Sequence, residues 1–135
     1  MKISGTYTPT KWDEVDYLLV SESMKSTKAS VEFQFAGDIE GLATVEYLMY
    51  YTSYDPTDQH SSQAQYVGQI RIVGSLQGKA GSFALNDSGT FNGGAASSRL
   101  EIISGSGTGE LSAISGHGSY LADQNGCTWE MEVNL

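Results

Sequence analysis

The two residues best suited to take part in a reaction are Glu46 and Arg71. They lie on two strand-like segments that follow one another in the chain. A carboxylate enclosed in a protein needs a partner, and an arginine on the facing strand supplies one. Such a carboxylate often has a shifted pKa and can act as a general acid or base. Gln69 and Tyr50 fall on the same face of the two segments. The four residues therefore form a candidate ligand-binding site, with Glu46 as the candidate catalytic residue.

This site requires segments 42–52 and 64–75 to pair as a hairpin with Glu46 opposite Arg71, and the shared face to point inward. A slip of one residue would turn every side chain to the other face. The alternative is a structural ion pair on the outer surface, because cross-strand pairs of opposite charge are favourable there too. The sequence leaves both alternatives open.

Alternation of apolar and polar residues is the dominant pattern along the chain, and it indicates β-strands. Every second residue is apolar from Ala29 to Phe35 and again from Trp129 to Leu135. Turn residues separate such segments at even intervals, which favours an antiparallel barrel or sandwich. We expect one all-β domain over residues 1–135, a closed, lipocalin-like antiparallel barrel. Its eight predicted strands are residues 2–13, 27–36, 42–52, 64–75, 80–91, 95–104, 115–122 and 127–135.

The connections between these strands are mostly short. Asn92-Gly93 and Asn125-Gly126 suit type I′ turns, because both central residues of that turn need positive φ. Residues 108–113 are the one candidate for a helical turn. Residues 14–26 are ambiguous, since Tyr17 to Val20 reads as a short strand or as part of a flap.

Segment 42–51 is largely apolar on both faces. Such a strand is usually covered on both sides. In a barrel one face is the interior, so another part of the protein must cover the outside. Two explanations fit: a second subunit, which makes the protein a homodimer, or residues 14–26 folded over the strand.

Asp87 is an exception within the segment 80–91. It shares a face with Phe83, Leu85 and Phe91, which is the face expected to pack. A position near the end of the strand and close to solvent explains it most simply, and a role in a binding site is the alternative. Cys127 is the only cysteine and reads as a packed thiol.

Composition and charge exclude several classes of function. The net charge of −9 repels phosphate backbones and anionic membrane surfaces, so we expect no nucleic-acid or membrane partner. The N-terminus lacks the apolar core of a signal peptide, and no apolar run approaches the length of a membrane helix. The expected location is therefore the cytoplasm. His60 and His117 are the only histidines and lie far apart, which gives no metal-ligand spacing, and no cofactor is expected.

Six stretches carry a family resemblance: Gly81–Phe83, Ser88–Phe91, Gly93–Gly94 and Gly105–Leu111, with Glu46–Met49 and Tyr66–Gly68 upstream. Together they resemble a family of small bacterial proteins of unknown function, and the likeness extends over nearly the whole chain. The resemblance implies an eight-stranded barrel similar to allene oxide cyclase. No motif of allene oxide cyclase itself maps onto this sequence residue by residue, so cyclase activity would rest on the fold alone.

Three functions fit these observations. The first is a barrel that binds a small, partly apolar molecule inside. The second is an enzyme of isomerase or cyclase type, with Glu46 as acid or base and Arg71 or Tyr50 as electrostatic support. The third is an oligomerising module whose barrel is filled with side chains. An interior cavity separates the first two from the third, and the enzyme requires Glu46 to face that cavity.

Overall fold

The computed structural model describes residues 1–58 and 61–135, and this part of the chain consists mainly of β-strands. Alternating apolar residues and short turns produce long strands, as the sequence pattern indicates. In chain order the strands are β1 (Lys2–Leu19), β2 (Lys25–Gly37), β3 (Ile39–Ser53), β4 (Gln63–Leu76), β5 (Lys79–Asn92), β6 (Ala95–Ile102), β7 (Thr108–Gly109), β8 (Ser115–Asp123) and β9 (Gly126–Asn134).

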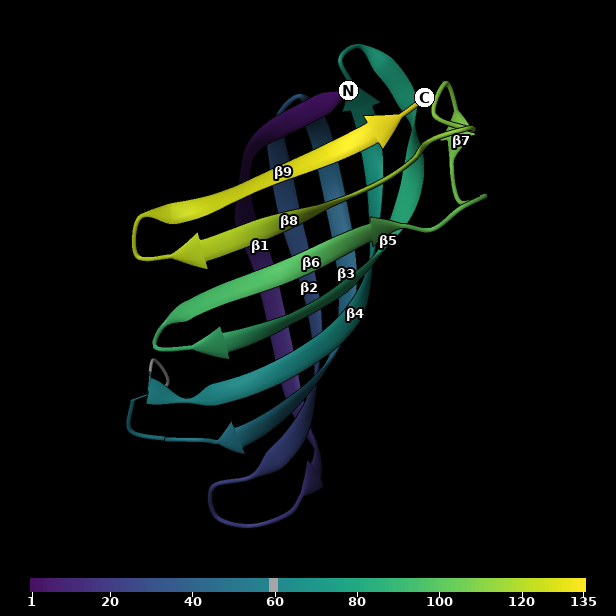
Figure 1. The fold of residues 1–135 in the computed structure, drawn as a ribbon. Coiled ribbons are helices and arrows are strands. Elements are labelled where there is room, and N and C mark those ends of the chain that lie inside the picture. Colours follow the sequence, from purple (N-terminus) through teal and green to yellow (C-terminus); the bar gives the residue numbers. More distant parts are fainter. Residues whose placement is uncertain (59–60) are drawn as a thin grey trace.

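Eight of these strands form a closed antiparallel ring (Figure 1). The order around the ring is β4-β3-β2-β1-β9-β8-β6-β5, and β4 closes it by pairing with β5. The short β7 pairs with β5 through Gly81 and Ser82. Each predicted strand segment is confirmed as a strand of this all-β arrangement.

The predicted helical turn over residues 108–113 is wrong. Thr108 and Gly109 form β7, and two turns follow, closed by Leu111 N–H to the Thr108 carbonyl (3.0 Å) and Ile114 N–H to the Leu111 carbonyl (3.1 Å). Pairing with the edge of β5 holds this segment extended, which outweighs its short helical pattern. In the described ranges, no helix has the length and apolar character needed to span a membrane.

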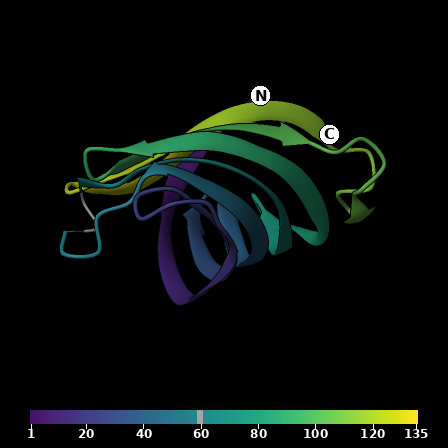
Figure 2. The ribbon, with the colours of Figure 1, turned by 90° about the horizontal axis from the view of Figure 1, so that it is seen from below.

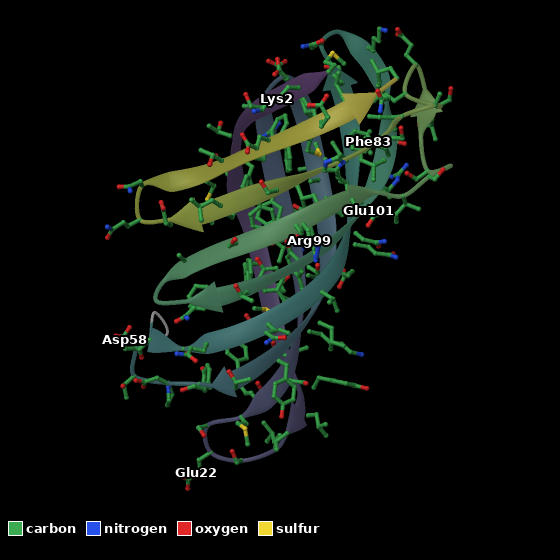
Figure 3. All side chains as sticks on the ribbon, in the orientation of Figure 1. Lys2, Glu22, Asp58, Phe83, Arg99 and Glu101 are labelled. Atoms are coloured by element: carbon green, nitrogen blue, oxygen red, sulfur yellow. The ribbon has the colours of Figure 1, made fainter. Side chains whose placement is uncertain are left out.

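The ambiguous residues 14–26 belong to one long hairpin. β1 continues to Leu19 and pairs with β2 from Gly5 to Leu19, with register shifts after Pro9 and Asp16. The end of this hairpin extends beyond the ring, so that Glu22 lies far from Lys2 (Figures 1 and 3). It does not fold over the outer face of β3 and β4, where large apolar side chains remain exposed.

The pairing of β3 with β4 differs by two residues from the expected one. Glu46 lies opposite Gln69, and Arg71 lies opposite Thr44. A register shift between Tyr51 and Ser53, beside the loop that joins the strands, sets this pairing. A displacement of two residues keeps the same side chains on each face. The predicted grouping of side chains by face is therefore correct, whereas the predicted cross-strand partners are wrong.

Alternate residues of the strands fill the inside of the ring. Val45, Ile70, Phe83 and Trp129 are each 2% exposed and belong to one apolar cluster. Figure 2 shows the strands curving around this interior. On β6 the side chains of Arg99 and Glu101 are exposed on the outside (Figure 3). Burial therefore assigns an inward and an outward face to the strands of the ring.

Two predicted turns lie elsewhere than expected. Between β5 and β6 the positive φ angles belong to Gly93 and Gly94, not to Asn92. Two glycines adopt this conformation without a Cβ penalty, so the turn moves one residue along the chain. Between β8 and β9 only Gly126 has positive φ, and Asn125 does not.

The seam between β1 and β9 is the shortest pairing among the ring's neighbours. It consists of five residue pairs and ends where Thr6 meets Thr128. The Trp129 indole N–H donates to the Thr6 carbonyl at 3.1 Å and secures this end. Pro9 follows, and proline is tolerated on such an unpaired edge because it has no N–H to donate. Beyond Thr6 the two strands diverge and leave an opening.

Candidate functional site

A cluster of hydroxyl groups around a buried carboxylate occupies the interior. Asp87 on β5 is 1% exposed. The Tyr47 hydroxyl donates to Asp87 Oδ2 at 2.7 Å. The Tyr120 hydroxyl lies 3.2 Å from that of Tyr47 and 3.0 Å from that of Tyr66, and Tyr66 lies 2.6 Å from the Ser98 hydroxyl. Five strands thus contribute one polar side chain each.

Two inward-facing glycines make room for these rings. A Cβ on Gly68 would come within 2.5 Å of Tyr47 Cδ1. A Cβ on Gly89 would lie 2.6 Å from Ser98 Oγ and 2.7 Å from the Tyr66 hydroxyl. The alternation that places apolar side chains inside is therefore interrupted where the tyrosines need space.

The hydrogen bonds of this cluster run in one direction. Each phenol or serine hydroxyl has one proton to donate. Because Tyr47 donates its proton to Asp87, Tyr120 must donate to Tyr47, Tyr66 to Tyr120 and Ser98 to Tyr66. The chain ends at Asp87, whose Oδ1 is buried without a hydrogen-bond partner among the described residues.

Burial dominates the protonation behaviour of the cluster. It raises the pKa of Asp87 above its usual value, while the hydroxyls of Tyr47, Ser98 and Tyr120 act in the opposite direction. Burial also raises the pKa of the Tyr47 and Tyr120 hydroxyls, and the nearby Asp87 carboxylate adds to the effect. The tyrosines are therefore neutral phenols at physiological pH.

An apolar chamber of about 110 Å³ lies against these tyrosines. Tyr47, Tyr66 and Tyr120 line it on one side, and Cys127 lines it as well. Pro9, which follows the last residue pair between β1 and β9, is also among its walls. The predicted packed thiol of Cys127 is partly buried against the core.

A second, wider hollow of about 470 Å³ adjoins the chamber, and we call it the vestibule. Trp12, Met49 and Phe91 line both spaces. Glu14 on the β1 hairpin lies in the vestibule and accepts three hydrogen bonds. The donors are the Trp12 indole N–H (3.0 Å), the Thr27 hydroxyl (2.6 Å) and the Tyr51 hydroxyl (2.8 Å).

The four residues proposed from the sequence lie on the opposite side of the sheet from this chamber. Glu46, Gln69 and Arg71 are exposed on the outer face of β3 and β4, and Tyr50 is 39% exposed there. Glu46 accepts a hydrogen bond from the Ser30 hydroxyl at 2.8 Å. The structure brings Glu46 and Gln69 together as cross-strand partners but encloses neither of them.

Asp87 is the residue that the sequence pattern placed on the packed face and then assigned to solvent. That assignment is wrong, because Asp87 lies inside the ring, where the Tyr47 hydroxyl satisfies one of its oxygens. The sequence did carry a signal for the cluster: Tyr47 and Tyr66 fall on the inward, apolar faces of their strands. His117 is exposed, and His60 lies outside the described residues. Residues 1–58 and 61–135 contain no group of three or more potential metal ligands.

Comparisons with known proteins agree with this fold. A family model described as "Protein of unknown function (DUF3224)" matches residues 3–134. A crystal structure of a protein with unknown function from the DUF3224 family of Shewanella oneidensis MR-1 is similar, with a TM-score of 0.75 and 20% sequence identity. The match covers 100% of this chain and 97% of that chain. No curated protein matches the chain.

Proposed function

Because the chain belongs to the DUF3224 family, whose description states no activity, we propose a function from the geometry of the site: the protein binds a small, partly apolar molecule inside an eight-stranded barrel. The observation that carries this proposal is the apolar chamber beside the tyrosine cluster, which shares three lining residues with the vestibule. Apolar pockets with a few convergent polar groups are the usual form of small-molecule sites. The closed ring of eight antiparallel strands supports a barrel of the allene oxide cyclase-like type.

The size of the chamber limits what its inner part can hold. An apolar cavity of roughly 150 Å³ can hold benzene. A chamber of about 110 Å³ is smaller and suits a chain or branch of about four or five carbons. At about 0.8 kcal/mol for each buried CH₂ group, such a fragment gains on the order of 3–4 kcal/mol before ordering costs. A natural ligand must therefore reach into the vestibule to bind more tightly than millimolar.

The chamber gives less support to the two alternative functions. An isomerase or cyclase with Glu46 as acid or base would need a substrate on the outer surface, because that carboxylate is exposed there and bonded to Ser30. An oligomerising module with a filled barrel would have no such space inside. The interior site therefore rests on the tyrosine cluster and Asp87.

Two measurements test ligand binding directly. Native mass spectrometry of freshly purified protein should reveal a bound molecule. Titration with 1-pentanol should shift the Met49 methyl signal in a ¹³C-methionine spectrum, because Met49 lines both spaces, and leave that of Met131, which lines neither.

A substitution that fills the chamber with a larger side chain supplies the control. Ala122 lines the chamber, so Ala122→Leu should abolish the Met49 shift. Ala36 is exposed on β2, so Ala36→Leu adds the same atoms outside and should change nothing. Absence of a bound molecule together with an unmoved Met49 signal would reject the proposal.

A second candidate function, self-association, has its own observation on the outer face of β3 and β4. Leu48 lies opposite Val67 and Leu42 opposite Val73, and all four are 44–55% exposed. Glu46 and Arg71 lie between these two apolar pairs. We propose that a second copy, turned end for end, packs here as a symmetric dimer.

The arrangement of this face is self-complementary. When the copy is turned end for end, Leu48 and Val67 of one subunit pack against the second apolar pair, Leu42 and Val73, on the other subunit. It also brings Glu46 beside the partner's Arg71, which matches opposite charges. The four residues first considered as a catalytic site, Glu46, Tyr50, Gln69 and Arg71, would then belong to a subunit interface.

Light scattering tests the dimer at micromolar concentration. The wild-type protein should have twice the mass of the chain, and Leu48→Lys should reduce it to a monomer. Leu121 is 45% exposed on β8, away from β3 and β4, so Leu121→Lys should stay dimeric. A monomeric wild-type protein contradicts the proposal.

A further inference from the structure

We propose that the ligand is a small aliphatic amine, whose ammonium group binds Glu14 in the vestibule while its hydrocarbon end occupies the apolar chamber. This inference rests on the proposed binding function and adds the chemical class and the orientation of the ligand. It follows from three features: the surroundings of Glu14, the charge of the vestibule and the saturation of the tyrosine cluster.

Glu14 is a carboxylate held in place by neutral groups. Trp12, Thr27 and Tyr51 donate three hydrogen bonds to its two oxygens. A carboxylate has about four acceptor positions, so one remains for a ligand. Within the described ranges no lysine, arginine or histidine forms a salt bridge with Glu14. The group is therefore fixed in position. Lys25 acts on it electrostatically without forming a salt bridge, so an ammonium ligand can supply the direct charged hydrogen bond.

Among the described residues, the only lysine lining the vestibule is already engaged. Lys25 Nζ lies 2.9 Å from Asp16 Oδ1 and 3.7 Å from the centre of the Tyr54 ring. This pair neutralises Asp16, so the described residues of the lining carry the single negative charge of Glu14. An anionic head group would be repelled there. The aromatic rings of Trp12 and Tyr51 beside Glu14 add a favourable surface for a cation.

The tyrosine cluster explains why the other end of the ligand is hydrocarbon. Every hydroxyl proton from Ser98 to Tyr47 is used in the chain that ends at Asp87. No donor of that chain remains for a carbonyl or carboxylate oxygen in the chamber. An apolar group faces the rings without leaving any of these hydroxyl protons unpaired. Asp87, whose Oδ1 has no partner, is not among the described residues that line the chamber. We therefore place the polar end of the ligand in the vestibule.

Three probes of the same length test the inference: n-pentylamine, 1-pentanol and pentanoate, each titrated at neutral pH and followed by the Met49 methyl signal. The amine is protonated there, since alkyl ammonium groups have a pKa near ~10.4. We expect the amine to bind at least about tenfold more tightly than the alcohol, because its hydrogen bond to Glu14 joins two charged groups. Pentanoate should bind most weakly.

Two substitutions test whether Glu14 is the group that binds the amine. Glu14→Gln should weaken amine binding to the level of the alcohol and leave the alcohol unchanged. Asp13 is exposed, lies one residue away and lines neither space, so Asp13→Asn removes the same charge and should leave the amine affinity within about twofold. The comparison of the three probes on the wild-type protein needs no variant, so the inference stays testable if Glu14→Gln fails to fold.

The outcomes separate the two proposals. If 1-pentanol or pentanoate binds as tightly as the amine, the inference is overturned and the binding function stands. If the amine binds best but Asp13→Asn weakens it as much as Glu14→Gln, a diffuse charge effect replaces the proposed contact and the inference is again overturned. If none of the probes moves the Met49 signal, the binding function itself is overturned at this site.

Discussion

At the scale of single residues, Asp87 and Tyr47 decide what the interior can do. Alternation along β5 places Asp87 on the same face as Phe83 and Leu85, and that much follows from the sequence. Its burial does not, because the groups that satisfy it come from other strands. Tyr47 on β3 supplies the hydrogen bond to Asp87, and Tyr120 on β8 approaches Tyr47. These contacts exist only once the ring has closed.

Removing the Tyr47 hydroxyl should be costly. Tyr47→Phe leaves Asp87 without its hydrogen-bond donor, and hydrogen bonds to charged groups contribute about 1.5–3 kcal/mol. We expect a loss of that size in the free energy of unfolding, measured with urea at neutral pH. Tyr50→Phe makes the same change at a partly exposed position of the same strand and should stay within about 0.5 kcal/mol. Equal losses in the two variants would argue against the buried network.

The pH dependence of stability should reveal the raised pKa of Asp87. Below pH 3.8 the carboxyl is protonated in both the folded and the unfolded chain. As the pH rises, the unfolded chain ionises first, so the favourable contribution of Asp87 is lost as the pH passes through its folded-state pKa. The free energy of unfolding of wild type relative to Asp87→Asn should therefore fall from about pH 4 towards pH 7. A rise over this range would contradict the assignment.

Asp55 provides a comparison of opposite sign. Hydrogen bonds from Thr57 lower the pKa of Asp55 to about 2, with a further contribution from the Ser61 hydroxyl. Its stabilising effect is present above pH 3.8 and is lost as the pH falls towards 2. Wild type should therefore lose its advantage over Asp55→Asn on acidification. Comparing the two variants separates the effect of a buried aspartate from that of a half-buried one.

At the scale of strands and turns, the sequence was informative about where elements lie and less so about how they pair. Period-two alternation located each strand of the ring, because a half-buried strand shows one apolar face. The register between β3 and β4 depends on the shift between Tyr51 and Ser53, which no local pattern reveals. The same holds for β7, whose extended form depends on its contact with β5.

The β4–β5 turn offers a test at this scale. Gln77 has a φ of 48° and precedes Gly78, which also has positive φ. Asparagine tolerates this region better than glutamine, so Gln77→Asn should raise the free energy of unfolding by about 0.5 kcal/mol. Gln124 occupies the β8–β9 turn without positive φ, and Gln124→Asn should have almost no effect. Thermal unfolding of both variants measures the difference, and an equal gain in both would refute the backbone explanation.

At the scale of the whole molecule, closure depends on a short seam. β1 and β9 share five residue pairs, whereas β3 and β4 share 14. The amino group of Met1 adds a hydrogen bond to the Val133 carbonyl at 2.9 Å, which ties the two ends of the chain together. The seam and the opening beside it are therefore the part of the ring held by the fewest backbone hydrogen bonds.

Weakening the seam should loosen it locally. Trp129→Phe removes the hydrogen bond to Thr6 and reduces packing against Phe35, and it should cost about 1–3 kcal/mol. Hydrogen exchange should show faster exchange for the amides of residues 2–6 and little change between β3 and β4. If protection falls evenly around the ring instead, the seam is not a separate opening unit.

The sequence by itself determined that this chain is all-β, that its strands alternate between two faces, and that a negative net charge opposes binding to phosphate backbones. These properties are local or additive along the chain. The tertiary structure alone decided which face points inward, and with it that Glu46 and Arg71 lie outside while Asp87 lies among tyrosines. Closing the ring brings residues distant in sequence within hydrogen-bond distance, and a candidate site made of such contacts cannot be read from any one strand.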